Sequence, residues 1–245
     1  MRITLLSDLH LRGIGDPSQR DLVRLLDSHP SPVWVFAGDT FDLWWGREGA
    51  VHAGLVPALA AMRRRIEAGD AVFLVPGNHD FHRLDVLEGA IGARVVDPWR
   101  GESGGRALLA LHGHQAWRPL SQRVFDRVVR SPIAAGVMAA LGSRRGQRLA
   151  AGIARTRMGQ RAVPLGPILE AQEALARSLR GEAEVVFVGH SHAPGTVDLG
   201  DGGLLVNLGD WVSHRSMAVV EGGEVSLLRW RDGALSPLRG PPARR

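Results

Sequence analysis

Short apolar runs alternate with segments of helical period through the first part of the chain. Five runs of consecutive apolar residues end in Gly, Pro or polar residues, and such runs predict strands that are covered on both faces. These runs are residues 3–7, 33–38, 71–77, 107–113 and 184–190. Residues 19–28 and 51–68, which separate the first three runs, have the pattern of helices. This alternation of strands and helices predicts a layered α/β fold.

The pattern changes after His192 to short apolar segments separated by tight turns. Four segments therefore predict the strands of a hairpin meander; they are residues 195–199, 203–209, 216–223 and 224–230. Residues 233–245 are rich in Gly, Pro and Arg. We expect them to form a frayed tail that is disordered over residues 236–245.

Residues 117–181 interrupt this scheme with a helical insert. Apolar side chains recur near a helical period from Leu120 to Leu141, and Pro132 is expected to break the first helix. Two further stretches in the insert, residues 144–159 and 167–181, also have the pattern of helices. We therefore expect a core formed by residues 1–116 and 182–235, with a helical cap at residues 117–181.

The basic residues of the chain are concentrated in this insert. All 30 basic residues are Arg, and the formal net charge is +5. The insert has 12 Arg against Asp126, Glu170 and Glu173, a local net charge of +9, whereas the rest of the chain carries −4. A basic insert beside the core indicates an anionic substrate or an anionic membrane surface.

The composition also restricts location and redox chemistry. The chain has no Cys, which excludes a disulfide framework, a thiolate metal site and a thiol nucleophile. No apolar run approaches the roughly 20 residues of a membrane span, and the first strand follows Met1 without room for a signal peptide. We expect a cytoplasmic protein, with peripheral contact to the inner membrane as a further possibility.

Residues of the types that bind metals follow each of the five apolar runs. They are, in order, Asp8 and His10; Asp39 and Asp42; Asn78, His79 and Asp80; His112 and His114; His190 and His192. Each group alone is commonly part of a turn or a set of hydrogen-bonded structural residues. Five such groups in succession favour a functional site, because the carboxyl ends of parallel strands converge on one crevice. A dense cluster of His and Asp would be costly to desolvate without a partner, and a metal ion supplies one.

The donor set indicates the kind of metal and the chemistry. Carboxylates, imidazoles and one amide oxygen, without sulfur, suit Mn²⁺, Fe²⁺, Zn²⁺ or Mg²⁺. The number of donors exceeds one tetrahedral site but suits two ions about 3.5–4 Å apart that share a carboxylate. Two such ions can hold the oxygens of a phosphoryl group and lower the pKa of a bound water. The pattern therefore predicts hydrolysis at phosphorus with two divalent metal ions as cofactors.

The order of these motifs resembles that of the calcineurin-like metallophosphoesterase superfamily. The matching motifs are Asp-x-His, Gly-Asp-x-x-Asp, Gly-Asn-His-Asp, His-Gly-His and Gly-His-x-His, between Ser7 and His192. The resemblance implies a four-layer α/β/β/α sandwich with the helical cap as an insert. It implies one metal ion held by Asp8, His10, Asp39 and His192. It implies a second ion held by Asp39 as the bridge, Asn78, His112 and His190.

The same resemblance assigns roles to the neighbouring residues. His79 would contact the phosphate or protonate the leaving oxygen, together with Asn78 on the substrate side. Asp80 would orient the His79 imidazole. Asp42 and His114 would lie beside the metal ligands without binding an ion. Mn²⁺ is the expected metal, with Fe²⁺ or Zn²⁺ as alternatives.

Within the superfamily, the chain resembles the UDP-2,3-diacylglucosamine pyrophosphohydrolases of lipid A synthesis. The segments that carry this likeness are SDLHL, GDTFDLWWG, GNHDF, GHSHAPG and NLGDW, together with the helical insert after His-Gly. The resemblance implies a nucleotide-linked lipid as substrate, with UMP and a lipid phosphate as products. The chain departs from the well-known bacterial members at His79, where they have Arg, and at His114, where they have Asp.

Other interpretations stay open at this point. The same metal site could serve a broad phosphodiesterase or phosphatase that acts on nucleotides or phosphoproteins. A nucleic-acid-binding scaffold would use the Arg of the insert on phosphates, but a scaffold has no need for seven converging ligands. Trp44 and Trp45 could form a lipid-facing wall or pack in the core. The Arg run 63–65 favours a solvated helix end, and Arg144, Arg145 and Arg148 could bind substrate or membrane.

Overall fold

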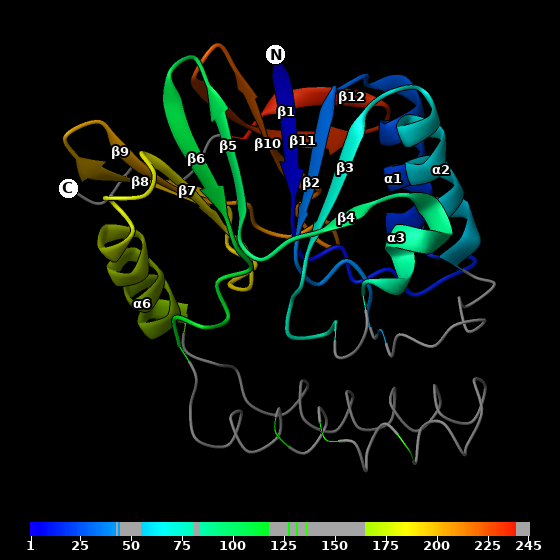
Figure 1. The fold of residues 1–245 in the computed structure, drawn as a ribbon, viewed down its shortest axis with the longest axis horizontal. Helices are drawn as coiled ribbons and strands as arrows, with labels where there is room; N and C mark the ends of the chain where they lie inside the picture. The colour runs from blue at the N-terminus through cyan, green and yellow to red at the C-terminus, as the bar shows by residue number, and fades with distance from the viewer. Residues whose placement is uncertain are drawn as a thin grey trace.

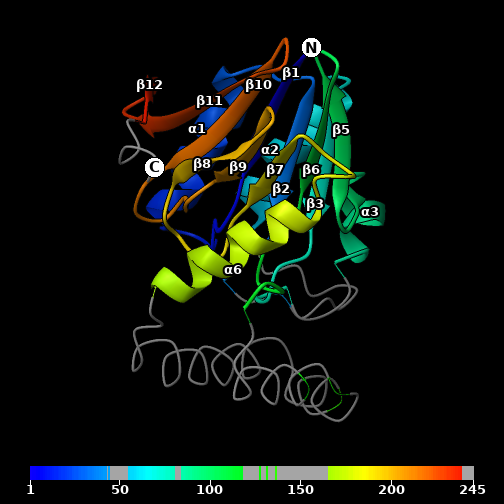
Figure 2. The ribbon, with the colours of Figure 1, turned by 90° about the vertical axis from the view of Figure 1, so that its left-hand side faces the viewer.

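The computed structural model describes residues 1–42, 44, 55–80, 84–117, 127, 131, 136 and 165–238. Two β-sheets pack face to face in this part of the chain, and helices cover their outer faces (Figures 1 and 2). The result is the expected four-layer α/β/β/α sandwich. Residues 118–126 and 137–164, which form most of the predicted cap, lie outside the described residues.

The first sheet has seven strands in the order β12-β11-β10-β1-β2-β3-β4. Its strands are β1 (Arg2–Leu6), β2 (Val33–Ala37), β3 (Ala71–Val75), β4 (Arg94–Val95), β10 (Ser216–Glu221), β11 (Glu224–Arg231) and β12 (Ala234–Pro237). Strands β1 to β4 are parallel, and β10 joins them antiparallel beside β1. The parallel strands place the residues that follow β1, β2 and β3 at the same edge.

The second sheet has five strands in the order β5-β6-β7-β9-β8. Its strands are β5 (Trp99–Ser103), β6 (Arg106–Ala110), β7 (Val185–Val188), β8 (Gly195–Gly200) and β9 (Gly203–Asn207). The central strands β6, β7 and β9 are parallel, and the outer strands β5 and β8 are antiparallel.

Alternation along the central strands separates two apolar layers. In β2, Val33 and Val35 face the second sheet, whereas Trp34 and Phe36 face the helices. Because every residue of β2 is buried, the strand reads as a continuous apolar run. This explains why the sequence shows runs and no polar–apolar alternation in these strands.

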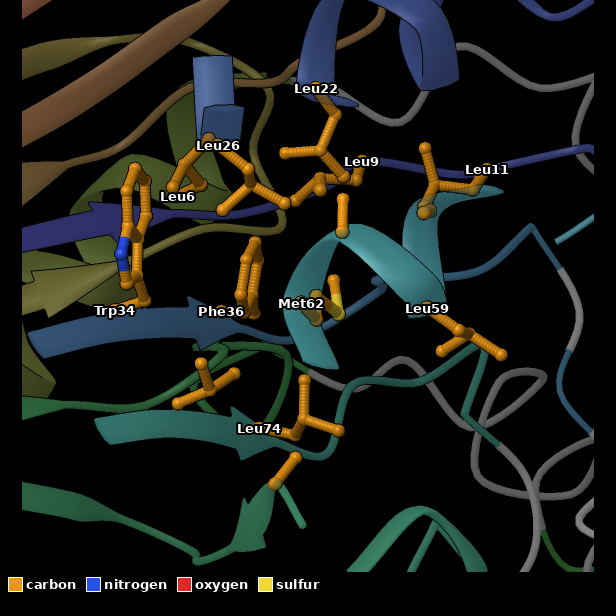
Figure 3. Close-up of a cluster of buried hydrophobic side chains, with 14 of the residues drawn as sticks. Leu6, Leu9, Leu11, Leu22, Leu26, Trp34, Phe36, Leu59, Met62 and Leu74 are labelled. Atoms are coloured by element: carbon orange, nitrogen blue, oxygen red, sulfur yellow. The ribbon is translucent and has the colours of Figure 1, made fainter. Parts of the chain in front are cut away.

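Helices α1 (Pro17–Ser28), α2 (Val56–Glu67) and α3 (Val86–Ile91) lie on the outer face of the first sheet (Figure 1). Leu22 and Leu26 of α1 and Met62 of α2 pack against Trp34 and Phe36 in one buried cluster (Figure 3). Asp16 caps α1, since its side chain accepts a hydrogen bond from the Ser18 amide at 2.9 Å.

Helix α6 (Leu165–Ser178) covers the outer face of the second sheet (Figure 2). Ala176 of this helix packs against Leu109, Val186 and Val188 in a third apolar cluster. The sequence placed this helix in the cap of 117–181, but its buried apolar side chains contact the sheet. Helix α6 is therefore a layer of the core.

Two further expectations need correction. The predicted meander is divided, because β8 and β9 pair in the second sheet whereas β10 and β11 pair in the first. The predicted frayed tail begins too early, because β12 pairs with β11 through residues 234–237. Residues 239–245 lie outside the described residues. The sequence pattern did not predict strands β4 and β5 or helix α3, since their segments are short or largely polar.

No helix among the described residues is long and apolar enough to span a membrane.

Candidate metal centre

The site lies where the carboxyl ends of strands from both sheets meet (Figure 1). The loops after β1 and β2 are joined by backbone hydrogen bonds from the Asp8 amide to Gly38 O, at 3.1 Å, and from the His10 amide to Asp39 O, at 3.0 Å. The loops after β6 and β7 are joined in the same way, because the Gly189 amide donates to His112 O at 3.0 Å. Adjacent strands therefore continue to pair as far as the site residues.

Five of the seven predicted metal ligands have a left-handed backbone. The φ angles are 52° at Asp8, 43° at His10, 50° at Asp39, 65° at His190 and 56° at His192. This region costs an L-residue about 1–2 kcal/mol. Such strain is concentrated at functional sites, where the surrounding structure holds it in place.

One group of donors consists of Asp8, His10 and His192, whose ligand atoms lie within 4.8 Å of one another. Asp8 Oδ1 lies 3.1 Å from His192 Nε2 and 3.8 Å from His10 Nε2, and the two Nε2 atoms are 3.4 Å apart. Asp8 Oδ1 is buried and accepts no hydrogen bond from the residues that the structure describes. Asp8 Oδ2 is occupied, since it accepts hydrogen bonds from the His190 amide and the Ser7 hydroxyl.

A second group is centred on Asp39, His112 and Asn78. His112 Nε2 lies 3.3 Å from Asp39 Oδ2 and 3.0 Å from Asn78 Oδ1. The opposite ring nitrogen, Nδ1, donates to Ala37 O at 3.1 Å. Because a carbonyl oxygen can only accept, this bond fixes the ring so that Nε2 faces Asp39 and Asn78.

Asp39 lies between the two groups. Its Oδ2 atom is 3.3 Å from His112 Nε2 and 3.9 Å from His10 Nε2. Its Oδ1 atom accepts the His79 amide at 2.8 Å. One carboxylate oxygen thus faces both sets of imidazoles, as a bridging ligand requires.

His190 lies beside this second group. Its ring centroid is 5.3 Å from that of His112 in an edge-to-face arrangement. His114 lies close to the same residues, with its ring 5.3 Å from His112 and 6.2 Å from His190.

His79 and Asp42 form part of a third group with His10. The His79 Nδ1 atom donates to Asp42 O at 2.7 Å, and its Nε2 atom lies 3.9 Å from Asp39 Oδ2. The Asp42 carboxylate is 3.8 Å from His10 Nδ1. The structure thus brings His79 and Asp42 to the metal-ligand cluster.

The expected contact between Asp80 and the His79 imidazole is wrong. Asp80 Oδ2 accepts the backbone amides of Asp39, at 3.0 Å, and Gly77, at 2.9 Å. Asp80 Oδ1 accepts no hydrogen bond from the described residues. The Asp80 carboxylate therefore points toward the backbone and holds the loop that carries Asp39. The His79 imidazole is oriented by the Asp42 carbonyl.

The glycines of the motifs make room for the ligands. A Cβ atom at Gly77 would collide with the side chain and amide of Asp39, and one at Gly189 would collide with Ser7 and Asp8. A Cβ atom at Gly38 would collide with the His112 ring. The glycines that precede the ligand residues in the sequence therefore permit close packing of the ligands from neighbouring loops.

The buried charges of the site shift one another's pKa values. Burial alone would lower the pKa of His112, but the carboxylates of Asp39 and Asp8 raise it to about 10. Burial opposes ionisation of Asp39, yet the charges of His112 and His79 hold its pKa well below its ordinary value. Burial and the charge of His112 lower the pKa of His190 to about 4. Without a bound ion, a pKa of about 10 would keep His112 protonated between the two carboxylates at neutral pH.

The residues present fit divalent metal ions. The unsatisfied Asp8 Oδ1 atom, the facing Nε2 atoms of His10 and His192, and the position of Asp39 between two donor groups all favour bound cations. The donors are oxygen and imidazole nitrogen, which suits borderline and hard divalent ions.

Comparison with known proteins agrees with this geometry. Residues 1–194 match the family described as Calcineurin-like phosphoesterase. The chain belongs to this family.

Curated relatives of this phosphoesterase cover most of its length. A UDP-2,3-diacylglucosamine hydrolase of Porphyromonas gingivalis is 29% identical, over 94% of this chain and 98% of the relative. A protein of the same name from Pseudomonas putida is 28% identical, over 85% of this chain and 90% of the relative. Together with the family match, these relatives identify a phosphoester or pyrophosphate hydrolase.

Solved structures of similar fold support the architecture. Yfce, a phosphoesterase from E. coli, has a TM-score of 0.50 and 15% identity over 96% of both chains. A double mutant of Vps29 from Entamoeba histolytica has the same TM-score and coverage at 16% identity. At this identity the likeness concerns the fold alone.

The phosphoesterase site includes supporting residues to which the sequence assigned no role. Ser7 donates to Asp8 Oδ2 at 2.6 Å, and the Trp211 amide donates to Asp8 O at 3.1 Å. Asp210 Oδ2 accepts His214 Nδ1 at 2.7 Å and lies 3.8 Å from His192 Nδ1. The segment NLGDW was noted for its likeness to relatives, and that likeness was the only available signal for Asp210 and Trp211.

Two open interpretations can now be assessed. Trp44 is 4% exposed and packs against Phe41 with ring centroids 4.8 Å apart, which favours core packing. Residues 63–65 form ion pairs on the helix surface, with partners Glu67, Asp27 and Asp70. Trp45, Arg144, Arg145 and Arg148 lie outside the described residues.

Proposed function

We propose that this phosphoesterase uses two divalent metal ions to cleave UDP-2,3-diacylglucosamine into UMP and 2,3-diacylglucosamine 1-phosphate. The observation that carries the metal-dependent part is the position of Asp39 Oδ2 between His112 Nε2 and His10 Nε2, at 3.3 Å and 3.9 Å. The substrate is supported by the names of relatives that align with most of the chain.

One ion would be held by Asp8, His10, Asp39 and His192, and the other by Asp39, Asn78, His112 and His190. We propose Mn²⁺ as the metal, with Fe²⁺ or Zn²⁺ as alternatives that the same donors accept. Bound ions supply Lewis acidity toward phosphoryl oxygens and lower the pKa of a bound water.

His79 is the residue that we assign to the phosphate or the leaving oxygen. Its Nδ1 atom donates to the Asp42 carbonyl, so Nδ1 carries the proton in the neutral ring. The Nε2 atom, which lies 3.9 Å from Asp39 Oδ2, then faces the cluster. A neutral ring accepts a proton or a hydrogen bond at Nε2, and a protonated ring donates one there.

Asp80 and Asn78 complete the proposed site. Asp80 stabilises the turn through the amides of Gly77 and Asp39, so it acts on catalysis through the position of Asp39. Asn78 lies in the same turn and places its amide oxygen next to His112 Nε2. We propose that Asn78 and His79 contact the phosphate as well, because Asn78 belongs to the ligand cluster and the next residue, His79, faces it.

A second candidate is a broad phosphodiesterase or phosphatase with the same metals. It is favoured by His79 and His114, which replace the Arg and Asp of the well-known lipid-specific enzymes. A nucleic-acid-binding scaffold is disfavoured, because it would not need the converging ligand donors.

A product assay on Mn²⁺-loaded protein separates these candidates. UDP-2,3-diacylglucosamine, bis-p-nitrophenyl phosphate and a nucleotide diester would be compared at equal protein concentration. We expect rapid release of UMP from the lipid substrate. The release of p-nitrophenol from bis-p-nitrophenyl phosphate and the cleavage of the nucleotide diester should both be slow. Activity on the small diesters alone would reject the lipid substrate and retain the metal site.

We also propose contact with an anionic membrane surface through Arg144, Arg145 and Arg148. The support is the net charge of +9 on residues 117–181, because segments rich in Arg attract anionic lipids. Co-sedimentation with phosphatidylglycerol vesicles should fall when the three residues are replaced by Gln. Equal binding by the variant would reject this contact.

A further inference from the structure

Two of the proposed metal ligands lie on one short loop, residues 189–193, which follows β7 (Val185–Val188). His190 and His192 both have positive φ, at 65° and 56°. A loop with two such residues does not favour this conformation by itself. The imidazoles therefore reach the site only if neighbouring groups hold the loop.

Gln172 of α6 holds the beginning of the loop. The side chain is fully buried, and its Nε2 atom donates to Gly189 O at 2.8 Å. Gly189 directly precedes His190. The bond therefore fixes the peptide that leads into the first imidazole.

Asn207, at the end of β9, holds the middle of the loop. Its Nδ2 atom donates to Gln172 Oε1 at 2.9 Å and to Ser191 Oγ at 2.5 Å. These two bonds use both hydrogens of the amide. Its oxygen accepts the Gly209 amide at 3.1 Å, so the Asn207 side chain is oriented from both ends.

Apolar contacts also attach α6 to the sheet. Ala176 of this helix already packs against Leu109 and Val186, and two buried amides cost free energy unless they are paired. Paired amides add direction, because each hydrogen bond requires a particular atom at a particular place. In this protein the amide hydrogen bonds are made to Gly189 O and to Ser191 Oγ, on the loop that carries His190 and His192.

We propose that Gln172 and Asn207 are positioning residues that hold loop 189–193, so that His190 and His192 face the Asp8 and Asp39 carboxylates. This inference rests on the proposed metal-dependent hydrolysis. Neither residue touches the ligand cluster itself in the contacts described above, and both act through Gly189 and Ser191.

The test measures Mn²⁺ binding by calorimetry for the wild type, Gln172→Met and Gln172→Glu. Met has a similar shape but no N–H donor, whereas an ionised Glu carboxylate keeps the acceptor for Asn207, loses the donor to Gly189 O and adds a buried negative charge beside that carbonyl oxygen. We expect the affinity for at least one ion to fall about 10- to 100-fold in Gln172→Met, with a fall at least as large in Gln172→Glu. The visible absorption of the Co²⁺-loaded protein should change as well, because it reports the ligand geometry.

Glu173→Gln is the matched control, since Glu173 is the next residue of α6 and pairs with Arg177 on the surface. It should bind Mn²⁺ like the wild type. The thermal midpoint of each metal-free variant is measured in parallel. A lower midpoint with unchanged Mn²⁺ affinity and unchanged Co²⁺ absorption would show a merely structural role and overturn the inference.

Ser191→Ala provides a second test if Gln172→Met does not fold. It removes only the hydroxyl that accepts from Asn207 and from the Ala193 amide. Weaker Mn²⁺ binding would support the inference, and unchanged binding in Ser191→Ala and Gln172→Glu would overturn it. If the wild type itself binds no Mn²⁺, the proposed function fails and the inference fails with it. If the wild type binds two ions and every variant binds them equally, only the inference fails.

Discussion

The packing of Gly77 against Asp39 gives a sharp test of the site geometry. A Cβ atom at position 77 would meet the Asp39 amide nitrogen and side-chain oxygen in direct collision, and it would lie 2.8 Å from Asp39 Cγ. The collision includes a backbone atom, so a side-chain rotation cannot relieve it. Gly77→Ala must therefore move the loop that carries the proposed bridging ligand.

The magnitude of this change follows from two contributions. Forcing a methyl group into a packed interior costs about 1–3 kcal/mol. Displacing Asp39 weakens the hydrogen bonds from the His79 amide and to Asp80, at 2.8 Å and 3.0 Å, and a bond to a charged group contributes about 1.5–3 kcal/mol. We expect a total loss of roughly 3–5 kcal/mol in the free energy of unfolding, together with weaker Mn²⁺ binding.

Urea unfolding and Mn²⁺ titration of Gly77→Ala provide the assay. Gly89→Ala is the control, because Gly89 lies in helix α3 and a Cβ atom there would meet nothing within 4 Å. This control should gain about 0.5–1 kcal/mol from helix propensity and bind Mn²⁺ normally. If Gly77→Ala unfolds at the same urea concentration as the wild type and binds two ions with equal affinity, the close packing of Gly77 on Asp39 is refuted.

Three further predictions address the metal site and the core. Asp39→Ala should lose both ions and abolish turnover, which metal analysis and the product assay check together; near-normal activity would reject a bridging role. Mn²⁺ binding at pH 8 should release about one proton, because the pKa of His112 is about 10 without metal and its Nε2 atom must lose that proton to bind an ion. Calorimetry in buffers of different ionisation enthalpy measures this release, and affinity should rise with pH; an enthalpy independent of the buffer would contradict it. Ser31→Ala should lose about 1–3 kcal/mol of stability, since Ser31 Oγ accepts from Thr4 at 2.9 Å in a buried site, while Mn²⁺ affinity stays unchanged.

The sequence pattern predicted a layered α/β fold and the convergence of the strand ends, because both depend on local patterns, whereas the four layers were implied by the family resemblance. Trp34 and Phe36 alternate with Val33 and Val35 in a strand buried on both sides, which makes the run uniformly apolar. The turn that follows, at Asp39, then falls at a carboxyl end in a parallel sheet, where topology brings the loops together.

The wrong predictions concern contacts between segments far apart in the sequence, which local patterns do not determine. The helical period of α6 predicts a helix, but not whether its apolar side faces a cap or the second sheet. The strands β9 and β10 look alike in sequence, yet residues 208–215 cross between the two sheets. The Asp80 carboxylate could have bonded an imidazole or a backbone amide, and only the folded turn shows that it bonds the amides of Gly77 and Asp39.

The left-handed backbone at five of the proposed ligands has a consequence for evolution. Glycine would adopt φ angles such as the 65° of His190 at little cost, but glycine has no side chain with which to bind an ion. A duplicated copy of the gene, released from selection for hydrolysis, would therefore gain stability by losing these His and Asp residues. In this lineage, we expect inactive descendants to be more heat-resistant than the enzyme from which they arose.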